Sequence, residues 1–203
     1  MRDAPIDFWF FVGSTYSYLS ILRIDSVASA QGVAFRWRPF NVRSIMIEQN
    51  NIPFRDKPVK AAYMWRDIER RAAMYGLKAK LPATYPLRES EIANRIAVVG
   101  ERRGWCADYV RAAYRRWFEQ GEEPGVEPCL SGSLSDIGLE PQQIIAAARA
   151  DDIGAEFVAS TEEAKRLGVF GSPTFAVDGE LFWGDDRMDD AIQWRQAGSL
   201  GRA

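Results

Sequence analysis

The sequence predicts an α/β protein in which a large all-helical insertion interrupts a four-stranded mixed β-sheet. Strand and helix patterns alternate at the N-terminus, and a helix, two short strands and a last helix follow near the C-terminus. From about Asn41 to about Gly154, in contrast, the patterns are helical and no strand is convincing. We therefore expect a sheet-forming domain from residues 1–40 and 155–203, and a helical insertion domain from residues 41–154.

The N-terminal segment is predicted to form a β-α-β unit. Residues Ile6–Val12 are almost continuously apolar and aromatic, which is typical of a strand buried on both faces. A helix is predicted over Tyr16–Ala30 and is expected to end at Gln31-Gly32. Val33–Pro39 then alternates in the manner of a second strand, so the crossover between the strands should be right-handed.

The middle segment contains several helical patterns. Pro58 suits the first turn of a helix that we expect to end at Gly76. The other helices are predicted over Glu89–Arg103 and Ala107–Gln120, with further helical turns that start at Ser135 and at Glu140-Pro141. The acidic stretch Gly121–Pro128, which contains proline and glycine, is predicted to be a connecting loop.

The C-terminal segment returns to strand patterns. A helix over Glu156–Leu167 precedes a short strand at Thr174–Val177, and Asp178-Gly179 is a strong hairpin signal. The returning strand, Glu180–Gly184, leads to a last helix over Arg187–Gln196. Together with the N-terminal unit, these elements make up a thioredoxin-like four-stranded sheet with helices on both faces.

The composition limits the classes of function. The chain has 203 residues, of which 47% are apolar, enough for a core, and its net charge of -2 favours neither nucleic acid nor an anionic membrane as a partner. The N-terminus lacks the basic and apolar regions of a secretory leader, and no apolar stretch approaches the roughly 20 residues of a membrane span. We therefore expect a cytoplasmic protein.

Histidine is absent from the chain and cysteine is rare. Without histidine, Ser-His-Asp catalysis, Cys-His catalysis and histidine metal ligation are excluded. The two cysteines, Cys106 and Cys129, form no Cys-x-x-Cys and no zinc pattern, so we expect buried, inert thiols and no metal site. Any thiol chemistry must then come from a bound cofactor.

A Ser-x-x-Ser motif, from Ser14 to Ser17, stands between the first strand and the first helix. Free N–H groups at a helix start attract anions, and a serine hydroxyl can donate a hydrogen bond to a thiolate. The chain has no histidine to act as the base that would make Ser14 itself a nucleophile. Ser14 is therefore either a helix cap or a donor to a thiolate that the protein does not itself carry.

Several short motifs, taken in order, resemble one known family. They are Asp7–Tyr18, Lys60–Asp67 with Tyr75-Gly76, Gly168–Phe175 and Phe182–Met188. Their order and spacing resemble the 2-hydroxychromene-2-carboxylate isomerases, which are related to kappa-class glutathione transferases and, more distantly, to DsbA-like disulfide oxidoreductases. The resemblance spans essentially the whole chain.

The resemblance implies a glutathione-dependent isomerase that acts on an aromatic or unsaturated carboxylate, a small molecule. In the resembled reaction, glutathione thiolate adds reversibly to the substrate, which permits ring opening and bond rotation, and glutathione is regenerated as a cofactor. The relatives also imply a homodimer. Two alternatives stay open: a kappa-like glutathione transferase that releases the adduct, and a thioredoxin-fold binding module without catalysis.

The resemblance also implies roles for residues around the Ser-x-x-Ser motif. Ser14 corresponds to the catalytic serine that contacts the glutathione sulfur. Ser172 precedes the position of the family's cis-proline, here Pro173, and its backbone pairs with the glutathione peptide. The family usually has proline directly after the active serine, where this sequence has Thr15.

Four further residues are implied as glutathione contacts. Asp185 and Asp186 correspond to the pair that holds the γ-glutamyl end, and Asn51 and Lys60 correspond to positions in the helical segment. From the residues alone, the two aspartates are explained equally well as acids at a helix start, and Lys60 as a solvated helix residue.

Three aromatic residues, Tyr63, Tyr85 and Trp183, are candidates for an aromatic substrate pocket, although aromatic side chains are more often part of a core. Cations for an acidic substrate are also available, but nothing in the sequence distinguishes among them. These cations are Arg38, Arg43 and Arg55.

Overall fold

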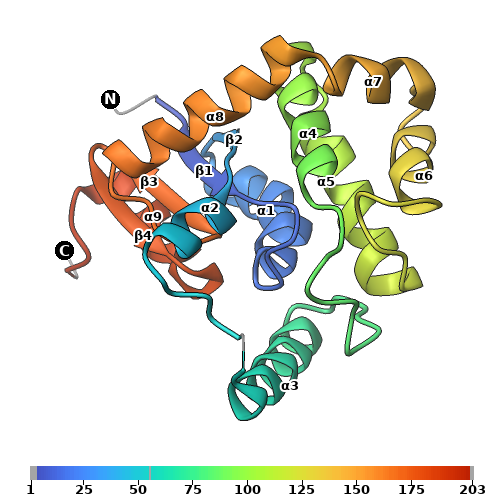
Figure 1. Ribbon diagram of the computed structural model, residues 1–203. Helices are drawn as coiled ribbons and strands as arrows, with labels where there is room; N and C mark the ends of the chain where they lie inside the picture. Colours follow the sequence, from blue (N-terminus) through green and yellow to red (C-terminus); the bar gives the residue numbers. More distant parts are fainter. Residues whose placement is uncertain (1–3, 55, 202–203) are drawn as a thin grey trace.

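A four-stranded sheet forms the centre of the computed structural model, which describes residues 4–54 and 56–201 (Figure 1). The strands are β1 (Ile6–Phe10), β2 (Phe35–Pro39), β3 (Thr174–Val177) and β4 (Glu180–Trp183). Their order is β2-β1-β3-β4, with β1 parallel to β2 and antiparallel to β3, and β3 antiparallel to β4. This arrangement confirms the predicted mixed sheet.

The N-terminal β-α-β unit has the predicted form. Helix α1 (Ser17–Gln31) joins β1 to β2 and ends at Gly32, which adopts the left-handed conformation expected of a helix stop. Phe8 in β1 lies opposite Trp37 in β2 and Phe175 in β3, with ring centroids 5.0 Å and 5.2 Å away. These cross-strand aromatic contacts form the centre of the core.

The middle segment is helical, as predicted. Its elements are α2 (Val42–Glu48), α3 (Pro58–Met74), α4 (Glu91–Arg103), α5 (Cys106–Arg115), a π-helical turn η1 (Arg116–Gln120), α6 (Cys129–Ser135) and α7 (Pro141–Ala148). The predicted helix over 107–120 is therefore divided into α5 and η1. Across the described part of the chain, no helix has both the length and the apolar character needed to cross a bilayer.

The prediction that Ser135 starts a helical turn is wrong, because Ser135 is the last residue of α6. The helix begins earlier, where the carboxylate of Glu127 accepts hydrogen bonds from both the backbone N–H and the hydroxyl of Ser131. It ends where Leu139 N–H donates to Leu134 O and Gly138 adopts a positive φ of 76°.

Helix α8 (Asp151–Arg166) begins earlier than the predicted Glu156. Asp151 and Asp152 lie in its first turn, where the helix dipole favours negative charge. The proposed domain boundary between residues 154 and 155 therefore falls inside α8, and the division into two domains otherwise stays a prediction.

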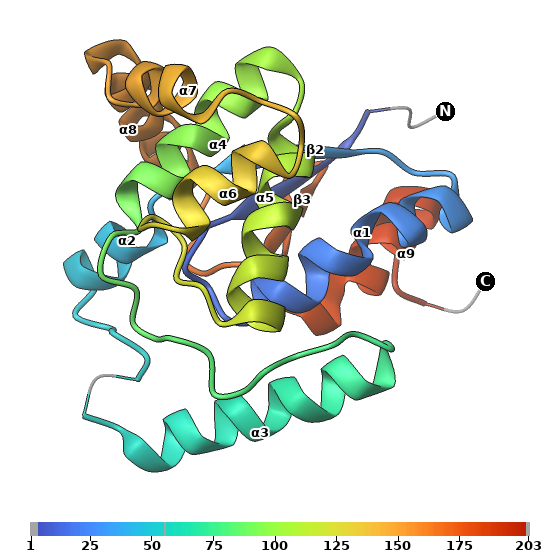
Figure 2. The ribbon, with the colours of Figure 1, turned by 90° about the vertical axis from the view of Figure 1, so that its right-hand side faces the viewer.

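Two helices cover opposite faces of the sheet. Helix α9 (Met188–Ala197) follows a 3-10 turn, η2 (Asp185–Arg187), and packs on the face that carries Phe8 and Phe182, where its Trp194 contacts the Phe182 ring. Helix α8 lies on the other face, in front of the strands in Figure 1. Figure 2 shows α1 and α9 side by side, whereas α3 runs along the lower edge of the molecule.

Strand β1 ends at Phe10 and does not extend to Val12 as predicted. Phe11 and Val12 are buried, but their backbone groups bond to side chains instead of neighbouring strands. Val12 N–H donates to Asn94 Oδ1 at 2.8 Å, and Asn94 Nδ2 donates to Val12 O at 3.0 Å and to Ser90 O at 2.8 Å. The fully buried amide of Asn94 thus replaces a strand partner and ties α4 to the end of β1.

We expect Asn94→Ala to lower the free energy of unfolding by about 2 to 4 kcal/mol, because it leaves a buried N–H and a buried C=O without partners. Urea unfolding followed by circular dichroism measures this loss. Asn41→Ala is the matched control, because Asn41 caps α2 at the partly exposed N–H of Ser44. This variant should lower the free energy of unfolding by about 1 kcal/mol. Equal losses in the two variants would contradict this explanation.

Candidate active site at the end of strand β1

A tight turn from Phe11 to Ser14 connects β1 to the residues that precede α1. Ser14 N–H donates to Phe11 O at 3.0 Å. Gly13 has a φ of 137°, and a Cβ there would lie 2.7 Å from the Phe11 ring, so the turn requires glycine. Helix α1 starts at Ser17 without a side-chain cap, so Ser14 does not act as its cap.

The hydroxyl of Ser14 is directed at the loop before β3. Ser14 Oγ donates to the backbone oxygen of Ser172 at 2.7 Å. The Ser172–Pro173 peptide bond is cis, which confirms that prediction, and Pro173 O accepts from Gly184 N–H at 2.9 Å. Ser14, Ser172 and Pro173, far apart in the sequence, therefore meet at one place.

Two further hydroxyls brace this contact. Ser172 Oγ accepts a hydrogen bond from Phe11 N–H at 3.0 Å and lies 2.9 Å from Ser17 Oγ. The phenol of Tyr114, at the end of α5, donates to the turn, with Phe11 O and Ser14 O both 2.9 Å away. Burial raises the pKa of Tyr114 well above its usual range, so this phenol stays neutral.

Helix α3 packs against the residues that follow Ser14. Thr15 Oγ1 donates to the sulfur of Met64 at 3.0 Å, and Tyr16 OH donates to Asp67 Oδ2 at 3.2 Å. Burial, together with Asp67, raises the pKa of Tyr16. Thr15 is buried, and its hydroxyl connects the turn to α3, which the proline usual in the family could not do.

The two predicted aspartates have different surroundings. Asp185 is 2% exposed, and its carboxylate accepts from Ser20 Oγ at 2.9 Å and from Arg23 Nε at 3.3 Å. Burial raises the pKa of Asp185, against the opposing effects of Arg23 and Ser20. Asp186 reaches the surface with its side chain 46% exposed, 3.9 Å from Arg71 on α3.

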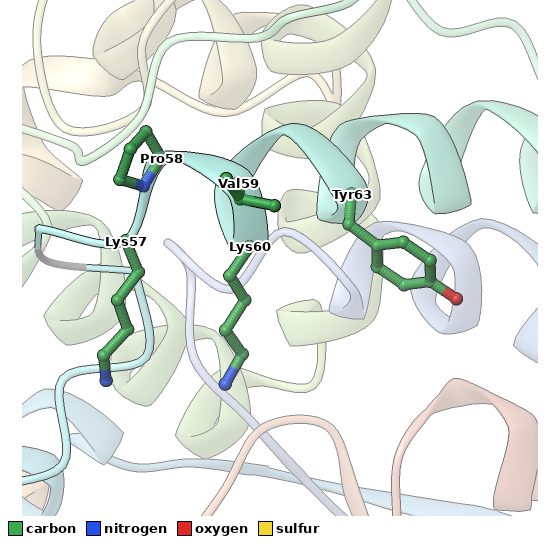
Figure 3. Close-up of a pocket in the computed structure, with 5 residues that line it drawn as sticks. All are labelled: Lys57, Pro58, Val59, Lys60 and Tyr63. Carbon is green, nitrogen blue, oxygen red and sulfur yellow. The ribbon is translucent and has the colours of Figure 1, made fainter.

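The N-terminal end of α3 lines an open hollow of about 530 Å³, together with the residues just before it. Its lining residues are Lys57, Pro58, Val59, Lys60 and Tyr63. Figure 3 shows the Lys57 and Lys60 side chains extending in the same direction. Two cations on one side of a hollow can bind an anionic ligand.

Lys60 lies one helical turn before the α3 residue that contacts Thr15. It precedes Met64 by four residues, so the two side chains share a helix face, and Met64 contacts Thr15. Asn51 is exposed, and its backbone N–H donates to Met46 O at 2.8 Å. Its predicted contact with glutathione stays a prediction.

The three predicted pocket aromatics lie in different surroundings. Tyr85 packs edge-on against Phe54 and Trp65, with ring centroids 5.8 Å and 6.3 Å away. Tyr63 is 61% exposed beneath Arg70, and Trp183 is 55% exposed against Phe170. Among the described residues, no ring contact joins Tyr63, Tyr85 and Trp183 to one another.

The candidate cations for an acidic substrate also lie in different surroundings. Arg43 lies near Tyr85, where it opposes the rise in the tyrosine pKa that burial causes. Arg38 stacks on Trp9 and pairs with Glu163 of α8, so its guanidinium is already engaged on the face of the sheet that α8 covers. Arg55 lies outside the described residues.

Sequence reasoning missed two of the residues that hold the turn, Asn94 and Tyr114. Asn94 carried a usable signal, because a polar side chain stands there among apolar neighbours on a predicted helix. Tyr114 carried none, because a tyrosine in an amphipathic helix is an ordinary core residue. Phe54, Trp65 and Lys57 were also missed, since they join the site only through folding.

Comparisons with known proteins identify relatives over nearly the whole chain. The model of the DSBA-like thioredoxin domain matches residues 5–193. A 2-hydroxychromene-2-carboxylate isomerase of Sphingobium xenophagum is 30% identical over 91% of this chain and 94% of its own length. Glutathione s-transferase kappa 2 of Caenorhabditis elegans is 25% identical over 90% of this chain and 88% of its own.

A solved structure of a 2-hydroxychromene-2-carboxylate isomerase is similar over the whole fold. It superposes with a TM-score of 0.83 and 25% identity, and the match covers 98% of this chain and 100% of that one. The chain therefore belongs to the 2-hydroxychromene-2-carboxylate isomerase family, within the proteins built on a DSBA-like thioredoxin domain.

Proposed function

We propose that this protein is a glutathione-dependent isomerase of an aromatic or otherwise unsaturated carboxylate. Three relatives named as isomerases and one named as a glutathione transferase, each matched over at least 90% of the chain, support an enzyme of isomerase or glutathione transferase type. The observation that carries the finer proposal is the hydroxyl of Ser14, placed 2.7 Å from Ser172 O beside the cis-proline. This hydroxyl is a hydrogen-bond donor at a turn that carries no thiol of its own.

In this proposal Ser14 stabilises a thiolate and does not attack the substrate. Its single proton points at Ser172 O, and a rotation about the side-chain bond redirects it toward an incoming sulfur. A hydrogen bond to an anion is stronger than one to a neutral carbonyl, so a thiolate can compete for this proton. The chain has no histidine, and no basic side chain hydrogen-bonds to Ser14 within the described residues.

The residues around the turn fit glutathione, which carries two carboxylates, an ammonium and peptide groups. Lys57 and Lys60 would hold carboxylate, the exposed carboxylate of Asp186 would hold the ammonium, and the Ser172 backbone would pair with the peptide. The hollow is open, so a ligand held there would stay partly exposed to solvent. Bound glutathione would supply a thiolate nucleophile that is released unchanged at the end of the cycle.

The substrate would lie against the aromatic cluster of Tyr85, Phe54 and Trp65. Its rings offer an apolar wall, and Arg43 beside Tyr85 offers a partner for a carboxylate. Lys60, 5.9 Å from the centre of the Phe54 ring, joins this wall to the hollow. An aromatic carboxylate therefore matches both the apolar and the charged parts of the cluster.

A kappa-like glutathione transferase is the second candidate, and the Caenorhabditis elegans relative supports it. Both reactions need the same stabilised thiolate, and they differ in whether the adduct is released. The homodimer and the cytoplasmic location stay predictions.

With catalytic glutathione, we expect the protein to convert 2-hydroxychromene-2-carboxylate to its open-chain isomer while the glutathione concentration stays constant. Ser14→Ala should lower the turnover number about 100-fold, because it removes one preorganised donor to a developing or bound anion. Ser14→Thr, which keeps the hydroxyl, should retain more activity. Accumulation of a glutathione adduct, tested with a chloronitrobenzene, would favour the transferase, and absence of glutathione binding by calorimetry would favour a binding module.

Tyr85→Leu should raise KM for the aromatic carboxylate about tenfold, because it removes a ring from the apolar wall. Glutathione affinity should stay unchanged. Steady-state kinetics and calorimetry measure the two effects separately. Arg66→Ala is the control, since Arg66 is exposed on α3 and pairs with Glu69. A fall in glutathione affinity with unchanged KM for the carboxylate would contradict the assignment of this wall.

Neither cysteine should react with a disulfide reagent near neutral pH while the protein is folded. Burial raises the pKa of the Cys129 thiol to about 11 and raises that of Cys106 further, so thiolate is scarce at both positions. Colorimetric titration before and after unfolding in guanidinium chloride measures the reactive thiols. Rapid labelling of the native protein would show that it carries a reactive thiol of its own.

A further inference from the structure

We propose that Tyr114 is a positioning residue for the active turn. Its phenol holds both ends of the turn, so that the partly exposed hydroxyl of Ser14 is held where it can turn toward a ligand. This inference rests on the proposed function, because it assigns the groups that hold Ser14 in its donor geometry. Nothing in the sequence pattern of α5 indicates such a role.

Tyr114 contacts both ends of the turn. Its phenol oxygen is 2.9 Å from Phe11 O and 2.9 Å from Ser14 O, and Phe11 O also accepts from Ser14 N–H. Tyr114 is fully buried, so water does not compete for these bonds. A single rigid side chain from α5 therefore sets the distance between the first and last carbonyl groups of the turn.

Two serine hydroxyls hold the other side of the turn. A carbonyl oxygen can only accept, so the phenol proton of Tyr114 goes to the turn. Ser172 Oγ accepts from Phe11 N–H at 3.0 Å and lies 2.9 Å from Ser17 Oγ. The N–H and the C=O of Phe11 are therefore both bonded, the first to Ser172 and the second to Tyr114.

Exposure distinguishes the two serines of the motif. Ser17 is fully buried, and its hydroxyl contacts Ser172 Oγ. Ser14 is partly exposed, and its proton goes to a backbone carbonyl at the same surface. Of the two, Ser14 is therefore the one that can exchange its acceptor for a ligand sulfur while the bonds of Tyr114 to the turn stay in place.

The experiment measures the pKa of the glutathione thiol bound to the protein, from the ultraviolet absorbance of the thiolate as a function of pH. Tyr114→Phe should raise this pKa by about 0.5 to 1 and lower kcat with little change in KM, because Ser14 is then less well aligned. Tyr109→Phe is the matched control. Tyr109 lies on the same helix, is also buried, and donates to Ala93 O at 3.1 Å, away from the turn.

Ser14→Ala separates this inference from the proposed function. If Ser14→Ala leaves the pKa of the bound thiol unchanged, the proposed function fails. If Ser14→Ala raises it while Tyr114→Phe matches Tyr109→Phe, the positioning role of Tyr114 is overturned and the proposed function stands.

Ser17→Ala provides a second route if Tyr114→Phe does not fold. Ser17 Oγ contacts Ser172 Oγ, which accepts from Phe11 N–H, so this variant loosens the turn at Phe11 and should also raise the pKa of the bound thiol. In the double variant of Ser17→Ala and Tyr114→Phe, the rise should be smaller than the sum of the single rises, because both variants loosen the backbone of Phe11. Full additivity would overturn the coupling between the two residues.

Discussion

The structure depends on how the backbone between Phe11 and Ser14 is hydrogen-bonded after it leaves the sheet. Buried N–H and C=O groups need partners, and here no neighbouring strand supplies them. Three side chains from distant parts of the sequence do so instead: Asn94 on α4, Tyr114 on α5 and Ser172 before β3. These bonds hold the helical segment and the sheet in one relative orientation, so the same contacts that stabilise the fold also shape the candidate site.

This constraint explains why the site is built from hydroxyl groups. Because the backbone groups of Phe11, Val12 and Ser14 are already hydrogen-bonded, the turn holds the Ser14 hydroxyl in a defined position, from which it can exchange its acceptor. Thiol chemistry by the chain itself is disfavoured, because burial raises the pKa of both cysteines and neither lies at the turn. The proposed cofactor would supply the thiol that the turn lacks.

Helix α3 supplies the charges that the turn lacks. Its face toward the turn carries Lys60, Asp67 and Arg71 at helical spacing, and hydrogen bonds or ion pairs join Asp67 to Tyr16 and Arg71 to Asp186. The helix lies along the edge of the molecule in Figure 2, where it packs against α1 and against the Thr15-Tyr16 segment that precedes α1. The site thus combines a rigid turn on the sheet with a charged wall from the helical segment.

The sequence by itself determined the mixed sheet, most helix positions, the Ser14 turn and the inert character of the cysteines. The periodicity of apolar residues, the positions of glycines and the absence of particular residue types can all be read without knowing which segments pack together.

Long-range packing decided the rest. The strand stops at Phe10 because Asn94 binds Val12, and Tyr85 joins Phe54 and Trp65 because three separate segments converge. Asp185 and Asp186, adjacent in the chain, differ in exposure because one faces Ser20 and Arg23 and the other faces solvent. Such differences arise from tertiary contacts, which no local pattern encodes.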